Sequence, residues 1–302
     1  MKKLGLAILL FGILSPFPAA SAVKIFACEP EWSALSRAVG GDAVSAWSAT
    51  TEQQDPHYIR ARPSLIARIR SARLVFCSGA GLEVGWLPIL MQRGARAGVQ
   101  PGRPGHLLAF EHVDVLEIPT VIDRSLGDIH PEGNPHLHLD PRNMLTLSRE
   151  LARRLAIVEP ESATSFQAGA KKFAENWQRR IAGWEPRIAK LKGMPVIVHH
   201  KSWSYLINWI GLKQVASLEP KPGIPPSADH LRKLIGEAKQ GKVKAIIRTP
   251  FDPDRPSEWL SGKTGIPAIE LPYTVPRGAG EAALAGLFDS ILVALEKANA
   301  GR

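Results

Sequence analysis

The sequence contains very few cysteines, and this scarcity narrows its chemistry. Among 302 residues only Cys28 and Cys77 carry a thiol, and they lack the close spacing of a zinc–thiolate site, so sulfur ligation is not expected. In an oxidising compartment the two cysteines could form one disulfide, or they could remain as unpaired buried thiols. The chain also lacks a His-Glu-x-x-His motif, the signature of a large class of zinc hydrolases.

Clustered charge is missing as well. The formal net charge is +10, but the basic residues are scattered along the chain and are not interleaved with aromatic residues. A nucleic-acid-binding surface needs such a cluster. The charge pattern therefore indicates a soluble, basic surface and no nucleic-acid partner.

A long apolar run occurs only at the start. Residues 1–22 combine a positively charged start, an apolar stretch over residues 4–17 and a small-residue cleavage site, Ala20-Ser21-Ala22. This pattern predicts a signal peptide, too short to span a bilayer as a mature helix. We expect a protein that begins near Val23 and is exported in soluble form to the periplasm. A lipid anchor on Cys28 is the alternative, although Lys24 interrupts the apolar region before it.

Short apolar runs alternate with helical patterns over the remaining residues. This rhythm predicts an α/β fold of two lobes with mostly parallel sheets, spanning residues 23–157 and 194–302. Between them, residues 158–193 carry an apolar stripe at steps of three and four, from Phe166 to Leu191. The stripe predicts one long connecting helix. Two ordinary helices that meet near Gly183 are the alternative.

Histidines stand at three widely separated loop junctions. His57 follows a proline in a loop after a predicted strand, and His200 lies at the carboxyl end of another, where ligands bind in open α/β sheets. His136 lies in the segment 134–141, where the prolines favour extended backbone, so His136 and His138 should share one face. Three neutral imidazoles can bind one zinc ion and leave a fourth position open.

Four motifs carry a resemblance to a known family. They are Gln54-Asp55-Pro56-His57, Gly79-Ala80-Gly81-Leu82-Glu83, the segment Asn134 to Pro141, and His200-Lys201-Ser202-Trp203. In this order they resemble the periplasmic solute-binding proteins of ABC transporters that import zinc or manganese, the zinc-uptake binding protein family.

The resemblance implies two lobes joined by a long rigid helix, with the metal in the cleft between them. It implies His57, His136 and His200 as the metal ligands and an inner-membrane ABC permease as the partner of a monomeric, non-enzymatic protein. His200 is preferred over His199 because it precedes the Lys-Ser-Trp sequence, and because strand alternation directs His199 to the opposite layer. Imidazole ligands favour Zn²⁺ over Mn²⁺.

The sequence departs from the family pattern in its acidic positions. Acidic residues of the family would fall near Arg248 and Pro272. The fourth ligand therefore stays open, the candidates being water, Glu219, Asp252, Glu270 and His138. The long His-rich loop of many zinc members is reduced to the neighbourhood of Asp128, His130 and Glu132, which either collects metal weakly or is merely solvated.

The residues thus support a protein that captures zinc and presents it to a permease. The competing hypotheses are an exported zinc-dependent hydrolase, a carrier of manganese rather than zinc, and a surface protein with an incidental metal. A hydrolase needs an open coordination site and a nearby general base. Asp55 and Asp140 lie in proline-bounded turns that suit the orientation of ligands instead.

Overall fold

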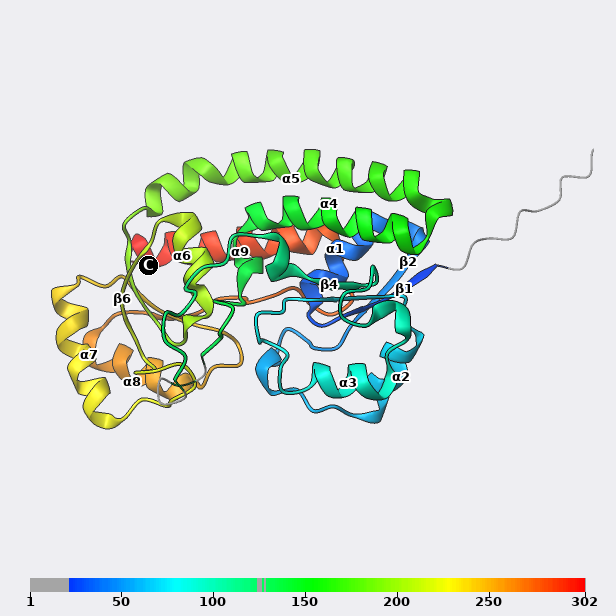
Figure 1. The fold of residues 1–302 in the computed structure, drawn as a ribbon. Helices are drawn as coiled ribbons and strands as arrows, with labels where there is room; N and C mark the ends of the chain where they lie inside the picture. Colours follow the sequence, from blue (N-terminus) through cyan, green and yellow to red (C-terminus); the bar gives the residue numbers. More distant parts are fainter. Residues whose placement is uncertain (1–21, 124–126, 128, 302) are drawn as a thin grey trace, which may run out of the picture.

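Two parallel sheets form the framework of the protein, seen in a computed structural model that describes residues 22–123, 127 and 129–301 (Figure 1). The predicted signal peptide up to residue 21, and Asp128, lie outside these residues. The first sheet consists of β1 (Val23–Ala27), β2 (Val44–Ser48), β3 (Leu74–Cys77) and β4 (His106–Leu108). The second consists of β5 (Pro195–Val198), β6 (Lys213–Ser217), β7 (Ala245–Arg248) and β8 (Ala268–Glu270).

The two sheets have the same topology. Their strand orders are β2-β1-β3-β4 and β6-β5-β7-β8, and all neighbouring strands are parallel. The predicted α/β fold with parallel sheets is therefore confirmed. In each sheet the second strand is added on one side of the first strand and the third strand on the other. Open parallel sheets bind ligands at the carboxyl ends of the strands where the order changes direction in this way.

Helices cover both faces of the sheets. The first half contains α1 (Pro30–Gly40), α2 (Pro63–Ser71), α3 (Leu87–Gly94) and α4 (Pro141–Val158). The long α5 (Ala163–Leu191) precedes α6 (Ser204–Ile210), α7 (Ala228–Gln240), α8 (Asp254–Thr264) and α9 (Glu281–Asn299). Single turns of 3₁₀ helix occur at η1 (Gly41–Ala43), η2 (Pro56–Tyr58), η3 (Ala97–Val99), η4 (Ala109–His112), η6 (Leu137–Leu139), η7 (Pro160–Ser162) and η8 (Lys201–Trp203).

Strand alternation divides the apolar side chains between one shared core and two outer cores. In β1, Ile25 belongs to the shared core, whereas Phe26 belongs to the outer core under α2 and α3. In β5, Val198 and Ile197 divide in the same way, with Ile197 packed toward α7 and α8. Successive side chains of a strand point to opposite faces, so strands covered on both sides are apolar throughout. The shared core is continuous across both lobes.

One long helix connects the lobes, as the apolar stripe predicts. Helix α5 continues through Gly183 and Pro186 without a break. Trp177 and Trp184 on its inner side pack against Phe288 of α9. Helix α5 spans both halves of the molecule and lies along α4 over the first lobe (Figure 1). Because this interface is large and aromatic, we expect the helix to hold the lobes rigidly.

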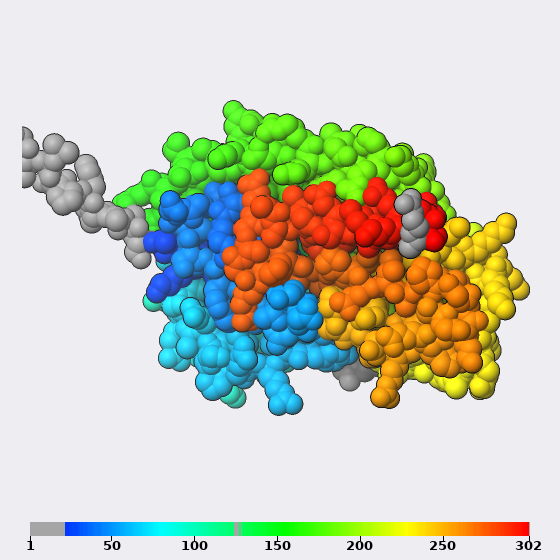
Figure 2. Space-filling view, turned by 180° about the vertical axis from the view of Figure 1, so that it is seen from behind, coloured from blue at the N-terminus to red at the C-terminus, as the bar shows by residue number. Residues whose placement is uncertain are grey.

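The chain also returns from the second lobe to the first. The segment before α9 lies against the first lobe (Figure 2). Its carbonyl at Ala279 accepts hydrogen bonds from the Arg37 guanidinium, while Arg277 donates to the carbonyls of Thr50 and Ala49. Among the described residues, none of the helices has both the length and the apolar character needed to cross a bilayer.

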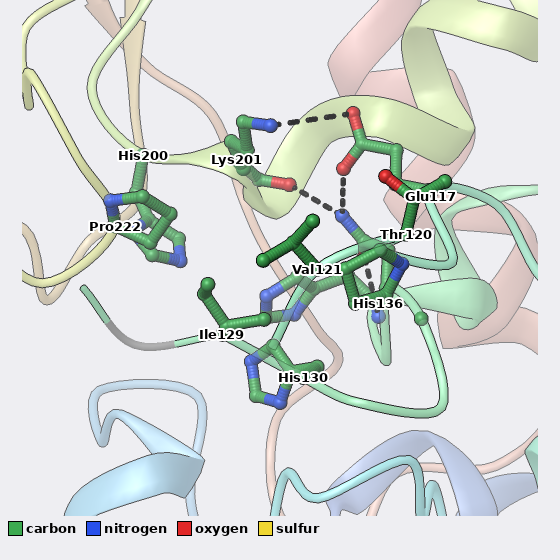
Figure 3. Close-up of a pocket in the computed structure, with 12 residues that line it drawn as sticks. Glu117, Thr120, Val121, Ile129, His130, His136, His200, Lys201 and Pro222 are labelled. Atoms are coloured by element: carbon green, nitrogen blue, oxygen red, sulfur yellow. Dashed lines mark hydrogen bonds and ion pairs between the residues drawn. The ribbon is translucent and has the colours of Figure 1, made fainter. Parts of the chain in front are cut away.

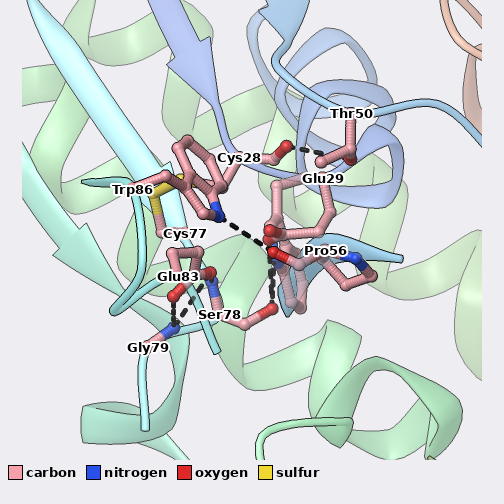
Figure 4. The surroundings of a disulfide bond; sticks show 10 residues. Cys28, Glu29, Thr50, Pro56, Cys77, Ser78, Gly79, Glu83 and Trp86 are labelled. Atoms are coloured by element: carbon pink, nitrogen blue, oxygen red, sulfur yellow. Dashed lines mark hydrogen bonds between the residues drawn. A yellow bond between two sulfur atoms is a disulfide. The ribbon is translucent and has the colours of Figure 1, made fainter. Parts of the chain in front are cut away.

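Cys28 and Cys77 form a disulfide at the ends of β1 and β3, with their Cα atoms 4.8 Å apart (Figure 4). The sequence left this pairing open.

Candidate metal centre

The structure brings the three predicted histidines together. The ligand nitrogens of His57, His136 and His200 lie within 4.8 Å of one another. Their ring centroids are 5.5–6.0 Å apart. His57 comes from the first lobe, His200 from the second and His136 from the connection between them. The cluster therefore lies where the two lobes face each other.

His57 is positioned by the turn that contains it. It lies in η2, which begins after Asp55, and the Asp55 carboxylate accepts a hydrogen bond from the His57 backbone N–H at 3.0 Å. The same oxygen lies 2.7 Å from Nδ1 of the ring. A carboxylate only accepts hydrogen bonds, so Nδ1 carries the proton and Nε2 is left for a metal.

His136 is positioned by Asn134 rather than by extended backbone. Its N–H donates to Oδ1 of Asn134 at 3.0 Å. Its φ and ψ are −81° and 37°, and η6 follows directly, so the predicted β-like segment is wrong. The Asn134 amide also donates to the carbonyl of Lys201, the residue after His200, at 3.0 Å. One side chain thus links the segments that carry two of the three histidines.

His200 follows β5, as predicted, and its Nδ1 lies 2.6 Å from Oε2 of Glu219. The same Glu219 oxygen accepts from the Gly223 N–H at 2.9 Å. His199 is buried. The cluster contains His200, and His199 is not among its residues.

Each of the three rings has an oxygen partner at Nδ1. For His136 the partner is the Tyr273 hydroxyl, 2.6 Å away. The buried Nε2 of His136 has no hydrogen-bond partner among the described residues. Metal-bound histidines show this arrangement, because the partner fixes the ring and leaves the other nitrogen to the ion. The cluster therefore fits a divalent transition metal.

The electrostatics differ among the three ligand positions. Burial and the neighbouring histidines hold the pKa of His136 well below its usual value. Burial lowers the pKa of His200, but the hydrogen bond and charge of Glu219 outweigh it, so the net shift is upward. Burial raises the pKa of Asp55, but its bonds to His57 dominate and lower it. A metal ion bound between these rings would displace protons from their ligand nitrogens.

The four protein candidates for the fourth ligand all have other partners. Glu219 is bonded to His200 and Gly223. Asp252 accepts from the Thr249 N–H at 2.7 Å. Glu270 pairs with Arg248 at 2.8 Å.

His138 also lies outside the cluster. Its Nε2 is 2.9 Å from the Tyr273 carbonyl, and its Nδ1 is 3.3 Å from the buried Glu31. The prediction that His136 and His138 face the same way is wrong, because the 3₁₀ turn η6 replaces the period-two alternation of a strand. Asp140, unlike Asp55, has no histidine among its hydrogen-bond partners in the described residues. It caps α4 and pairs with Arg142 instead.

Sequence reasoning missed the position of His130. Its Nε2 lies 3.2 Å from Nε2 of His57. It lines a cavity of about 360 Å³ together with His136 and His200 (Figure 3). The sequence placed His130 only in the shortened His-rich loop. Its contact with His57 spans 73 residues, and local sequence patterns cannot predict a contact at that separation.

Two buried acids, Glu29 and Glu83, lie near the disulfide and Pro56 (Figure 4). Glu83 accepts hydrogen bonds from the N–H groups of Ser78 and Gly79. Burial raises the pKa of Glu83 to about 7. Trp86 in the same region donates to the Pro56 carbonyl at 2.9 Å, so this layer supports the turn that presents His57.

Comparison with known proteins gives a consistent result. The sequence profile described as "ZnuA: Zinc-uptake complex component A periplasmic" matches residues 25–298. The manganese ABC transporter substrate-binding lipoprotein PsaA of Streptococcus pneumoniae serotype 4 is 19% identical over 289 residues, covering 91% of this chain and 90% of that protein.

Two further relatives carry zinc-uptake names. The high-affinity zinc uptake system protein ZnuA of Brucella abortus strain 2308 is 26% identical over 123 residues, covering 40% of this chain and 37% of that protein. A crystal structure of ZnuA superimposes with a TM-score of 0.75 at 20% identity, covering 93% of this chain and 99% of that one. At this identity the structural match shows the fold.

Proposed function

The chain belongs to the zinc-uptake complex component A family, and from this premise we propose that it captures Zn²⁺ in the periplasm and delivers it to an inner-membrane ABC permease. Members of this family are the metal-binding components of ABC transporters, and they act by binding rather than by turnover. Family membership therefore removes the hydrolase alternative. His57, His136 and His200 are the proposed ligands, and the protein acts as a monomer.

The set of donor atoms is the observation that supports zinc. Three imidazoles converge with Nε2 available, and the carboxylates nearby are hydrogen-bonded to other groups. Imidazole suits zinc, whereas carboxylate and other oxygen ligands suit manganese. The manganese names of several relatives keep Mn²⁺ as the second candidate.

Metal titration of the purified protein tests the proposal. We expect one Zn²⁺ per chain, bound tightly enough to compete with a chelator, and a midpoint of thermal unfolding that rises with added zinc by mass action. Mn²⁺ should compete weakly.

Single substitutions locate the site. His57→Ala, His136→Ala and His200→Ala should each weaken zinc binding. His230→Ala is a matched control, because His230 lies on α7 with its Nε2 at the Ser217 carbonyl. Zinc affinity that survives all three cluster substitutions unchanged would disprove the assignment.

A further inference from the structure

We propose that His130 is a fourth protein ligand, so that the centre holds its ion with four imidazoles and selects Zn²⁺-like ions over Mn²⁺. This inference rests on the proposed metal-binding function and specifies its ligand class. The sequence and the family resemblance place three histidines at the site; the fourth comes from the described geometry.

The separation between His130 and His57 is that of two ligands on one ion. Nitrogen ligands about 2.0–2.1 Å from a tetrahedral zinc lie about 3.3 Å from each other. The two Nε2 atoms are 3.2 Å apart. The same separation suits a hydrogen bond between a protonated and an unprotonated ring nitrogen, so the metal-free pair is already held at ligand spacing.

The His130 ring also lies close to two of the three core rings. Its centroid is 5.2 Å from that of His57 and 6.4 Å from that of His136, only slightly beyond the 5.5–6.0 Å among the three core histidines. It is not part of the set whose ligand atoms all lie within 4.8 Å. Completing the shell therefore requires an inward shift of the His130 ring.

A glycine provides the space behind His130. Gly81 has a φ of +80°, and a Cβ added there would lie 3.3 Å from Nδ1 of His130 and 3.9 Å from Glu132. The Gly79–Gly81 turn therefore lets the segment that carries His130 approach the first lobe closely. In Figure 3 the His130 ring lies below the rings of His136 and His200.

The carboxylates near the cluster leave the fourth position to a nitrogen ligand. Asp55 and Glu219 orient His57 and His200 through Nδ1, and Asp252 caps the turn after β7. A shell of four neutral nitrogens matches the preference of zinc and other late first-row ions, while Mn²⁺ prefers oxygen. His130 thus acts as a selectivity residue as well as a ligand.

X-ray absorption spectroscopy of the full-length protein loaded with Zn²⁺ counts the ligands directly. We expect four imidazoles in the wild type and three in His130→Ala. Chelator competition should show at least about a tenfold loss of zinc affinity, since even an orienting partner of a ligand contributes that much. Mn²⁺ affinity should fall less, so the zinc-to-manganese affinity ratio should decrease. His230→Ala is the control.

The outcomes separate this proposal from the proposed function. Four imidazoles that become three, with a reduced affinity ratio, support the fourth ligand. Three imidazoles plus oxygen in the wild type, or unchanged zinc affinity in His130→Ala while His57→Ala fails to bind, would overturn His130 but leave the metal carrier intact. A wild type that binds no Zn²⁺ would overturn the proposed function itself.

Discussion

Replacing Tyr273 by phenylalanine would remove one oxygen atom from the metal centre and leave the aromatic ring in place. The Tyr273 hydroxyl is the oxygen partner of His136 at Nδ1, 2.6 Å away. Burial, with nearby acidic groups, raises the pKa of Tyr273 well above its usual value, so the phenol stays neutral. With a metal on Nε2 of His136, the Nδ1–H would donate to this oxygen, and that bond would fix the direction of Nε2.

The size of the effect follows from the role of such partners. Loss of a group that orients a metal-bound histidine typically costs 10–100-fold in metal affinity, or about 1.4–2.7 kcal/mol. His138 keeps its bond in the variant, because that bond goes to the Tyr273 main-chain carbonyl. We therefore expect Tyr273→Phe to stay folded and to lose zinc affinity within this range.

Chelator competition with Zn²⁺ measures the change, and unfolding of the metal-free protein monitors stability. Tyr205→Phe is the matched control, because the buried Tyr205 hydroxyl bonds only to the main chain of Asn134 and Leu116 among the described residues. Both variants should be less stable than wild type, but Tyr205→Phe should keep near-normal affinity. Wild-type zinc affinity in Tyr273→Phe would refute the orienting role of the hydroxyl.

Three further predictions concern the surroundings of the site. Glu219→Gln keeps an acceptor for His200 but removes a negative charge, so zinc affinity should fall about tenfold in the same competition assay; an unchanged affinity would contradict this. Replacing Cys28 and Cys77 by alanine opens a crosslink between residues 49 apart and should lower the free energy of unfolding in urea by about 4 kcal/mol, by the loop-entropy argument; no loss would count against it. Because burial raises the pKa of Glu83 to about 7, the folded protein keeps a proton that the unfolded chain releases near pH 4.5, so stability from this group declines as pH rises between these values. Glu83→Gln should remove that slope, and its stability relative to wild type should grow from about pH 5 to 7.5; a difference independent of pH would show that Glu83 does not titrate in this range.

Much of the fold follows from local patterns. The strands and helices of both lobes have the spacing of apolar residues that burial requires. In α5 the apolar residues from Phe166 to Leu191 recur every three or four positions and form the buried side of the helix. His57 and His200 were predictable as site residues for a related reason. Both follow a strand at its carboxyl end, and the ends of parallel strands meet at one edge of a sheet.

The remaining parts of the site depend on contacts between distant residues. His136 and Tyr273 are 137 residues apart, and nothing local in either segment reports their hydrogen bond. The turn at His136 was mispredicted for a similar reason. Prolines favour extended backbone, but the Asn134 side chain bonds to the His136 N–H and stabilises a turn instead. The sequence left Glu219 as a candidate ligand, because its hydrogen bond to the His200 ring is visible only in the folded chain.

A zinc-edge anomalous difference map from crystals of the zinc-loaded protein tests the central claim most directly. The account predicts one strong peak in the cleft, about 2.0–2.1 Å from Nε2 of His57, His136 and His200. A peak bonded to fewer than three of these nitrogens, or located away from the cleft, would contradict it.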